Sequence, residues 1–141
     1  MDLFSALRSM KVLLVDDDEW IRDSLCIYFE SEGCRIHAQA TAEDGLNTLN
    51  RQKFDVIISD YRLPGMDGVE FFQKIRKSHP DAIKILITAY PTNTVSCQAM
   101  QAGVQRVIPK PFTSRIILDC LTALTEPSIV HCQKKPLSGI P

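Results

Sequence analysis

The chain has 141 residues, of which 45% are hydrophobic and 23% charged, with a formal net charge of −1. These values are typical of one soluble globular domain, and the balanced charge argues against a general nucleic-acid-binding surface. Because no apolar run reaches the roughly 20 residues of a membrane span and the N-terminus lacks a signal-peptide pattern, we expect a cytoplasmic protein that binds neither a membrane nor DNA directly.

The first half of the chain alternates short apolar runs with helical patterns. Val12–Val15 is a continuous apolar run that predicts a strand, and apolar residues at helical spacing follow it up to Gly33. A weaker strand is predicted over Arg35–Ala38, and Thr41 opens the next helix with a capping pattern. Val56–Ser59 predicts the third strand.

The second half continues this alternation. A helix that carries Phe71, Phe72 and Ile75 is predicted after a glycine-containing loop, and Pro80 is expected to end it. The remaining predicted elements are a strand at Ile85–Ile87, a helix at about Thr94–Ala102 closed by Gly103, a strand at Val107–Ile108 and a helix through Leu118, Leu121 and Leu124.

The pattern of the strands predicts the fold class. Continuous apolar strands indicate a sheet that is covered on both faces, and regular alternation with helices indicates parallel strands with right-handed crossovers. The sequence therefore predicts an α/β fold, a three-layer doubly wound domain over residues 11–125. Residues 1–10 are expected to be a lead-in, and residues 126–141, with three prolines, a C-terminal tail or linker stub.

Polar residues stand where four of the predicted strands end. Asp16 and Asp17 follow the first strand, Asp60 follows the third, Thr88 ends the fourth and Lys110 follows the fifth. In an open parallel sheet, ligands bind beyond the carboxyl ends of the strands, near the point where the strand order reverses. Each residue alone has an ordinary explanation as a helix-start, strand or loop residue, but their coincidence on one rim predicts a site.

The residue types on this rim indicate the chemistry. Three carboxylates repel one another unless a cation lies among them, and an all-oxygen ligand set selects a hard divalent ion such as Mg²⁺. No cysteine or histidine stands nearby, and the five cysteines are expected to be reduced thiols. Lys110 and the Thr88 hydroxyl suit phosphoryl oxygens, so Asp60 is a candidate nucleophile that forms an acyl phosphate.

The segments VLLVDDDEWIRDSL, DVIISDYRLPGMDGVEFFQKIR, ILITAY and VIPKPF occur in this order along the chain. Together they resemble the receiver domain of two-component response regulators, of the kind found in chemotaxis regulators, over residues 11–124. The resemblance implies a flavodoxin-like fold with five parallel strands in the order 2-1-3-4-5 and five helices. It also implies a phosphorylation-controlled signalling domain, and not an enzyme beyond its own phosphoryl transfer and dephosphorylation.

The resemblance assigns roles to the acidic residues. Asp60 resembles the aspartate that accepts a phosphoryl group from a sensor histidine kinase or a phosphotransfer protein. Asp17 and Asp60 resemble the carboxylate ligands of Mg²⁺, together with the backbone carbonyl of Arg62, and Asp16 resembles the acid that holds the ion through water.

Four further positions concern the switch. Thr88 resembles the hydroxyl that moves onto the phosphoryl group, and Lys110 resembles the family's lysine, whose bond to the following proline is cis there. The sequence departs from the family at Val107, where Tyr or Phe is usual, and Tyr90 is a candidate substitute. The family tunes hydrolysis two residues after the phosphoacceptor and two after the switch hydroxyl. These positions hold Arg62 and Tyr90, so their size predicts a long-lived phosphoryl state.

Three other classes of protein remain open. A phosphohydrolase of the haloacid-dehalogenase type also uses an aspartyl nucleophile, but its DxD pattern is replaced by DYR. A flavodoxin-type cofactor binder needs a phosphate-cradling loop where DDDE stands. A scaffold that is never phosphorylated is kept open by Val107. No effector motif follows residue 125, and the resemblance implies partner binding or a homodimer through the face formed by the fourth helix, fifth strand and fifth helix.

Overall fold

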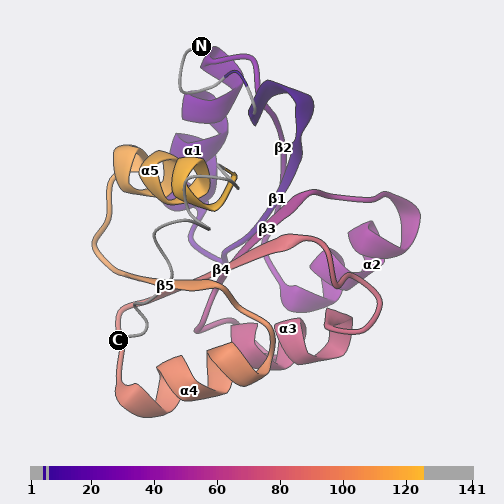
Figure 1. The fold of residues 1–141 in the computed structure, drawn as a ribbon, viewed down its shortest axis with the longest axis vertical. Coiled ribbons are helices and arrows are strands. Elements are labelled where there is room, and N and C mark those ends of the chain that lie inside the picture. Colours follow the sequence, from indigo (N-terminus) through magenta and orange to yellow (C-terminus); the bar gives the residue numbers. More distant parts are fainter. Residues whose placement is uncertain (1–4, 6, 126–141) are drawn as a thin grey trace.

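The computed structural model describes residue 5 and residues 7–125. Five parallel strands form one sheet in the order β2-β1-β3-β4-β5, with helices on both of its faces (Figure 1). The predicted fold class, strand order and five helices are thereby confirmed. The elements are a short 3₁₀ helix (Leu7–Ser9), β1 (Lys11–Val15), α1 (Glu19–Ser31), β2 (Arg35–Gln39), α2 (Ala42–Arg51), β3 (Val56–Asp60), α3 (Gly68–Ile75), β4 (Ile83–Thr88), α4 (Asn93–Gln101), β5 (Arg106–Pro109) and α5 (Ser114–Thr125).

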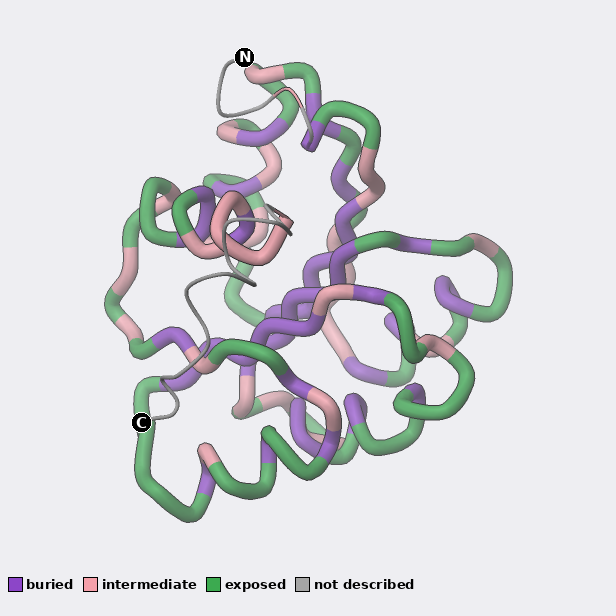
Figure 2. The backbone as a smooth tube through the Cα atoms, in the orientation of Figure 1, coloured by how far each residue is buried: buried purple, intermediate pink, exposed green. Residues whose placement is uncertain are grey.

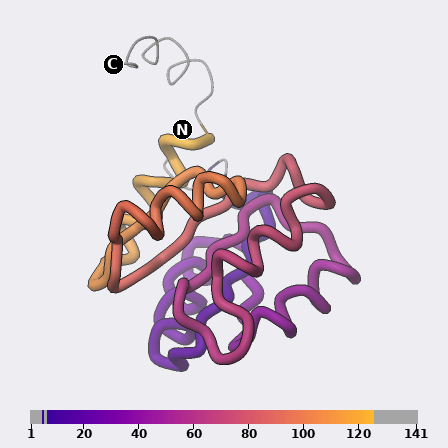
Figure 3. Tube along the Cα trace, turned by 90° about the horizontal axis from the view of Figure 1, so that it is seen from below, coloured from indigo at the N-terminus to yellow at the C-terminus, as the bar shows by residue number. Residues whose placement is uncertain are grey.

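The sheet divides the hydrophobic core into two halves, because successive side chains of a strand point to opposite faces. Leu13 and Val15 pack with apolar residues of α2, α3 and α4. Val12 and Leu14 pack on the other face, with residues of α1 and α5. Figure 2 shows the central strands as the most continuously buried part of the chain. Helices α2 and α5 accordingly lie on opposite sides of the molecule in Figures 1 and 3.

Four helices begin at residues whose side chains accept hydrogen bonds from the first turn, as expected for capping residues. Asp18 caps α1 and Asp67 caps α3. Thr41 caps α2 as predicted, and Thr92 caps α4. These caps start the helices immediately after the strand ends or the loops at the acidic rim.

Most strands are one or two residues longer than predicted, and the ends of β3 and α3 differ in ways that can be followed locally. Strand β3 extends one residue further than expected, so Asp60 is its last residue and follows the strand geometry. Helix α3 ends at Ile75 and does not continue to Pro80. There the regular pattern is interrupted, because the Arg76 amide donates to the Gln73 carbonyl, three residues back. The Ser78 hydroxyl and the His79 amide both donate to the Ile75 carbonyl before the proline.

Part of the lead-in belongs to the packed domain. Leu7 is only 1% exposed and lies in the core between the sheet, α1 and α5. The tail predicted over residues 126–141 lies outside the described residues, as do residues 1–4 and 6. The four cysteines that the structure describes, at positions 26, 34, 97 and 120, are free thiols. Over the same residues, no helix has both the length and the apolar character needed to cross a bilayer.

Candidate functional site

The predicted rim residues meet at the carboxyl ends of the central strands. Asp16 and Asp17 follow β1, and Asp60 ends the neighbouring strand β3. Thr88 ends β4, and Lys110 follows β5. Strand β2, which the sequence analysis left without a site residue, lies at an edge of the sheet. The site therefore lies where the strand order reverses, at the position that doubly wound sheets use for ligands.

Three carboxylates form the centre of this site. One oxygen from each of Asp16, Asp17 and Asp60 lies within 4.8 Å of the others. Asp16 is fully buried and Asp60 nearly so, while Asp17 is exposed. The Lys110 ammonium lies 3.1 Å from Oδ2 of Asp60, to which it donates, and 3.8 Å from Oδ2 of Asp16. One lysine therefore faces three acids.

Burial makes the ionised form of two of these acids unfavourable. It raises the pKa of Asp16 to about 6, and the negative charge of Asp60 adds to this rise. Burial also raises the pKa of Asp60, although the Lys110 ammonium opposes the shift. The electrostatics of the rim thus call for more positive charge than Lys110 provides.

The donor set fits a hard divalent cation. Among the described residues, no donor forms a hydrogen bond with the buried Oδ2 of Asp16, and the Lys110 ammonium at 3.8 Å is its only ion pair. A buried carboxylate oxygen without a hydrogen bond is costly, and a cation among the three acids would relieve that cost. Oxygen ligands of this kind suit Mg²⁺. The three acids are therefore a cluster able to hold such an ion.

The backbone around Asp16 is fixed by contacts that the sequence analysis did not identify. The Asp18 amide donates to Oδ1 of Asp16 at 2.9 Å, and the Arg22 guanidinium donates to its carbonyl at 2.8 Å. The Asp16 amide in turn donates to the carbonyl of Gln39 on β2. Arg22 lies in the first turn of α1. The only feature of the sequence that could have indicated its role is its position a few residues after the acidic run.

The loop between β3 and α3 requires glycine at a close approach. A Cβ atom at Gly68 would lie 2.3 Å from the backbone oxygen of Asp60, so any larger residue would push α3 away from the strand end. Gly65 has φ of +78°, a conformation that favours glycine. The Gly68 amide donates to the Tyr61 carbonyl and closes the loop. The direction of the Arg62 carbonyl stays a prediction.

The switch residues form a connected group beside the carboxylates. Thr88 is fully buried, and its hydroxyl accepts a hydrogen bond from the Tyr90 amide at 2.9 Å. The Arg62 guanidinium lies 4.7 Å from the centre of the Tyr90 ring, which joins the two loops that the sequence singled out. Val107 is half-buried and packs against the half of the core that lies between the sheet and helices α2, α3 and α4. The Lys110–Pro111 peptide bond is cis, as the resemblance implied.

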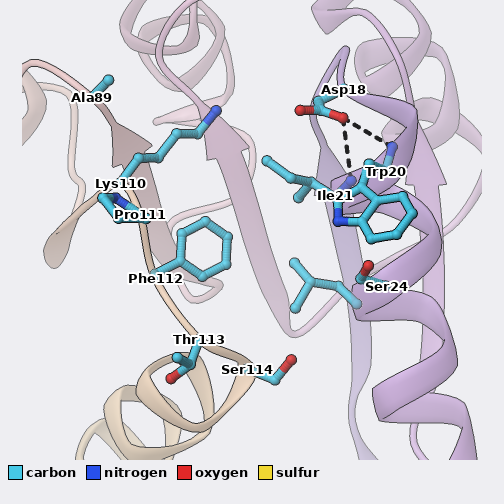
Figure 4. A pocket seen from close by; sticks show the side chains of 11 residues that line it. Asp18, Trp20, Ile21, Ser24, Ala89, Lys110, Pro111, Phe112, Thr113 and Ser114 are labelled. Carbon is cyan, nitrogen blue, oxygen red and sulfur yellow. Dashed lines mark hydrogen bonds between the residues drawn. The ribbon is translucent and has the colours of Figure 1, made fainter.

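A pocket of about 620 Å³ adjoins the acidic site and was not anticipated from the sequence. It lies between α1 and the connection from β5 to α5, and Lys110 forms part of its wall (Figure 4). Trp20 and Phe112 contribute its two aromatic side chains. The only feature of the sequence that could have indicated this pocket is the apolar character of these two residues, which follow the acidic run and Lys110 closely in the chain.

Fold and rim together define a doubly wound α/β domain with an acidic, lysine-containing site at the switch point. The family model for the response regulator receiver domain matches residues 12–122. The chain therefore belongs to the receiver domain family of two-component response regulators. This membership decides against the phosphohydrolase and the flavodoxin-type cofactor binder as its class.

Curated relatives and solved structures agree with this assignment. The chain is 38% identical over 109 residues to the response regulator protein FleR of Pseudomonas aeruginosa, covering 77% of this chain and 23% of FleR. It is 37% identical over 100 residues to the transcriptional regulatory protein GlrR of Escherichia coli, covering 71% and 22%. The chain thus spans about a quarter of the length of these relatives. A CheY-like receiver domain protein from Methanospirillum hungatei superposes with a TM-score of 0.77 at 34% identity, covering 79% of this chain and 90% of that one.

Proposed function

We propose that Asp60 accepts a phosphoryl group from a phosphohistidine on a sensor histidine kinase or a phosphotransfer protein. The observation that carries this proposal is the position of the Asp60 carboxylate, nearly buried, 3.1 Å from the Lys110 ammonium and within 4.8 Å of two other carboxylates. An aspartate with a purely structural role does not require a lysine and two other carboxylates around it. A phosphoryl acceptor requires a nucleophilic oxygen and nearby positive charge that neutralises the phosphoryl group.

The transfer requires little covalent chemistry from the protein. An ionised Asp60 oxygen attacks phosphorus, the bond from phosphorus to the donor's imidazole nitrogen breaks, and its electron pair returns to the imidazole ring. Lys110 keeps Asp60 ionised by opposing the pKa rise that burial causes, and then offers its ammonium to a phosphoryl oxygen. Beyond this transfer and the hydrolysis of the resulting acyl phosphate, which releases inorganic phosphate, we assign the domain no reaction of its own.

Asp16, Asp17 and Asp60 would hold Mg²⁺ in this proposal, with the Arg62 carbonyl as a fourth ligand and Asp16 acting mainly through water. The buried Oδ2 of Asp16, which accepts no hydrogen bond from the described residues, supports this assignment. When bound, the ion supplies the positive charge that phosphoryl oxygens and the attacking carboxylate require.

The switch in this proposal runs through Thr88 and Tyr90. When the Thr88 hydroxyl turns towards a phosphoryl oxygen, it loses the hydrogen bond that it accepts from the Tyr90 amide. The conformation of the loop from β4 to α4 then changes. Because Val107 has no ring to turn inward, we assign the reporting role to Tyr90, whose ring is 53% exposed and contacts Arg62.

The face formed by α4, β5 and α5 is the proposed surface for output partners or a homodimer. It carries the exposed apolar side chains of Met100 and Ile116, which support a protein contact there. FleR and GlrR are named as regulators, and GlrR as a transcriptional one. By analogy, we propose that the domain controls an output of that kind in the cytoplasm, which is in keeping with the free thiols of the described cysteines.

The direct test is incubation with Mg²⁺ and acetyl phosphate, followed by intact-mass measurement. We expect one phosphoryl group on the wild-type chain and none on Asp60→Asn. Asp67→Asn is the matched control, because asparagine caps a helix as well as aspartate does and this residue lies on the same loop. No phosphoryl addition, with acetyl phosphate or with a cognate kinase, would instead support a scaffold that is not phosphorylated.

A further inference from the structure

The pocket beside the acidic site is large, open and predominantly apolar. Its volume of about 620 Å³ lies between the first turns of α1 and the connection that follows β5. Figure 4 shows Phe112 facing Ile21 across this space, with Trp20 at its outer side. Trp20 is 79% exposed, which is unusual for the only tryptophan of a chain, since burial would stabilise so large a ring.

Lys110 connects this pocket to the phosphoacceptor. Its side chain lines the pocket, and its ammonium lies 3.1 Å from Oδ2 of Asp60. Ala89, directly after Thr88, is another lining residue, so the pocket wall includes the neighbour of the switch hydroxyl. The hydroxyls of Ser24 and Ser114 add hydrogen-bond donors to the apolar lining. A ligand in the pocket therefore meets apolar walls, one ammonium, a few donors and the Asp18 carboxylate, which accepts hydrogen bonds from the first amides of α1.

This combination matches a molecule with two unlike ends. A phosphoryl group at one end suits the rim of Asp60, Thr88 and Lys110, whereas an apolar, flat group at the other end suits the wall formed by Phe112 and Ile21. The carboxyl group that joins the two ends of an acyl phosphate would then lie on the Lys110 side of this wall. An acetyl group has no ring to place against the wall.

We propose that this pocket is an acyl-group subsite, through which the domain takes phosphoryl groups from small aromatic acyl phosphates in preference to acetyl phosphate. The proposal rests on the proposed phosphorylation of Asp60. An Asp60 oxygen attacks phosphorus, the bond between phosphorus and the acyl oxygen breaks, and the aromatic carboxylate leaves with the electron pair. No oxidant, reductant or additional proton is required.

The first experiment compares benzoyl phosphate with acetyl phosphate as donors to the 141-residue chain. The measured quantity is the ratio of kcat/KM for the two donors, read from intact mass in the presence of Mg²⁺. We expect this ratio to fall about tenfold in Trp20→Ala and in Phe112→Ala, because each removes much of the apolar surface that a ring would cover. The rate with acetyl phosphate should stay near wild type. Comparing ratios cancels the different intrinsic reactivity of the two donors.

Ile27→Ala is the matched control for these variants. Ile27 is an apolar residue of α1 that is 68% exposed and lies outside the pocket lining. Its substitution should leave the ratio unchanged. If Trp20→Ala and Phe112→Ala behave like Ile27→Ala, the acyl-group subsite is disproved. A loss confined to transfer from a protein phosphohistidine would assign the pocket to a protein partner, which also overturns the proposal.

The second experiment measures binding without phosphoryl transfer. Because Trp20 is the only tryptophan, its fluorescence reports on the pocket. Benzylphosphonate, which cannot transfer a phosphoryl group, should change this fluorescence saturably in the presence of Mg²⁺, and methylphosphonate, which lacks the ring, should do so at least about tenfold more weakly. Phe112→Leu, which keeps an apolar contact with the core, should weaken the response to benzylphosphonate. Equal responses to the two phosphonates would overturn the proposal.

The two experiments separate this inference from the phosphoacceptor role. If neither donor phosphorylates Asp60, the proposed function fails, while the fluorescence titration still decides whether the pocket binds an aromatic group. If acetyl phosphate reacts and the donor ratio is insensitive to Trp20 and Phe112, the proposed function stands and the acyl-group subsite fails.

Discussion

The carboxylate of Asp16 combines full burial with one oxygen that no described residue satisfies. Such an arrangement lowers the stability of the metal-free fold, and violations of this kind concentrate at functional sites. The neighbouring Asp18 shows the contrast, because its carboxylate caps α1 and is satisfied by two backbone amides. Within one run of acids, Asp16 and Asp17 thus belong to the carboxylate cluster, whereas Asp18 caps the helix.

The raised pKa of Asp16 predicts a pH dependence of stability. An acid whose pKa is about 6 when folded and about 3.9 when unfolded holds its proton more tightly in the folded state. The free energy of unfolding of metal-free protein should therefore fall as pH rises from about 4 to 6, by at most about 3 kcal/mol from this group. Urea unfolding in EDTA at several pH values measures it.

Asp16→Asn should remove this contribution and make the metal-free protein more stable above pH 6, while the exposed Asp23→Asn serves as a control. An identical pH slope for wild type and Asp16→Asn would contradict the assignment. Added Mg²⁺ should restore stability to the wild type above pH 6 and leave Asp16→Asn much less affected.

The contact between Arg62 and Tyr90 predicts a slow loss of the phosphoryl group. A cation–π contact at an exposed position is worth about 0.5–1 kcal/mol, so removing either partner should speed hydrolysis about two- to fivefold. Release of inorganic phosphate from phosphorylated Arg62→Ala and Tyr90→Ala measures this. Arg115→Ala is the control, because this arginine pairs with Asp119 on α5, away from the site. The idea fails if neither of the two variants hydrolyses faster than wild type.

At the scale of elements, the start of α3 determines how closely the helix approaches the end of β3. Asp67 and Glu70 form a reciprocal capping box, which stabilises the first turn. Gly68 then lets this turn pass against the backbone oxygen of Asp60. The loop that carries Arg62 is thus held at both ends, by the strand and by the capped helix.

Gly68→Ala is expected to be strongly destabilising. The new Cβ atom would lie 2.3 Å from a backbone oxygen that cannot move without shifting β3, and overpacking of this kind costs about 1–3 kcal/mol or more. Urea unfolding measures the effect. Gln73→Ala, a substitution at an exposed position of the same helix, is the control. A change in unfolding free energy below about 0.5 kcal/mol, the range of ordinary surface substitutions, would show that α3 adjusts freely.

At the scale of the whole molecule, the domain is held by two core halves on opposite faces of one sheet. The half beneath α1 and α5 includes Leu7, which precedes the first strand and lies outside the region matched by the family model. The folded unit of this chain therefore begins earlier than its family pattern does.

Leu7→Ala should lower the free energy of unfolding by about 2–5 kcal/mol, the usual range for removing a buried leucine side chain. Ile27→Ala is the control, because it shortens an exposed apolar side chain and should have little effect. Thermal or urea unfolding of both variants checks the prediction. Equal stability of the two would mean that Leu7 contributes nothing to the core.

The sequence by itself determined the alternation of strands and helices, the order of the site residues along the chain and their place at strand ends. These features depend on local periodicity and on neighbours in the chain, which sequence patterns report directly. It was less successful at the end of α3, because no glycine or proline stands between Ile75 and Pro80 to mark where the helix stops.

Only the tertiary structure decided which distant side chains meet. The stacking of Arg62 on Tyr90, the 3.1 Å contact between Lys110 and Asp60, and the pocket between Trp20 and Phe112 all join residues from different strands, loops or helices. Their distances follow from how the sheet twists and how the helices pack on it. No local pattern contains that information, because each contact depends on the positions of two separately folded segments.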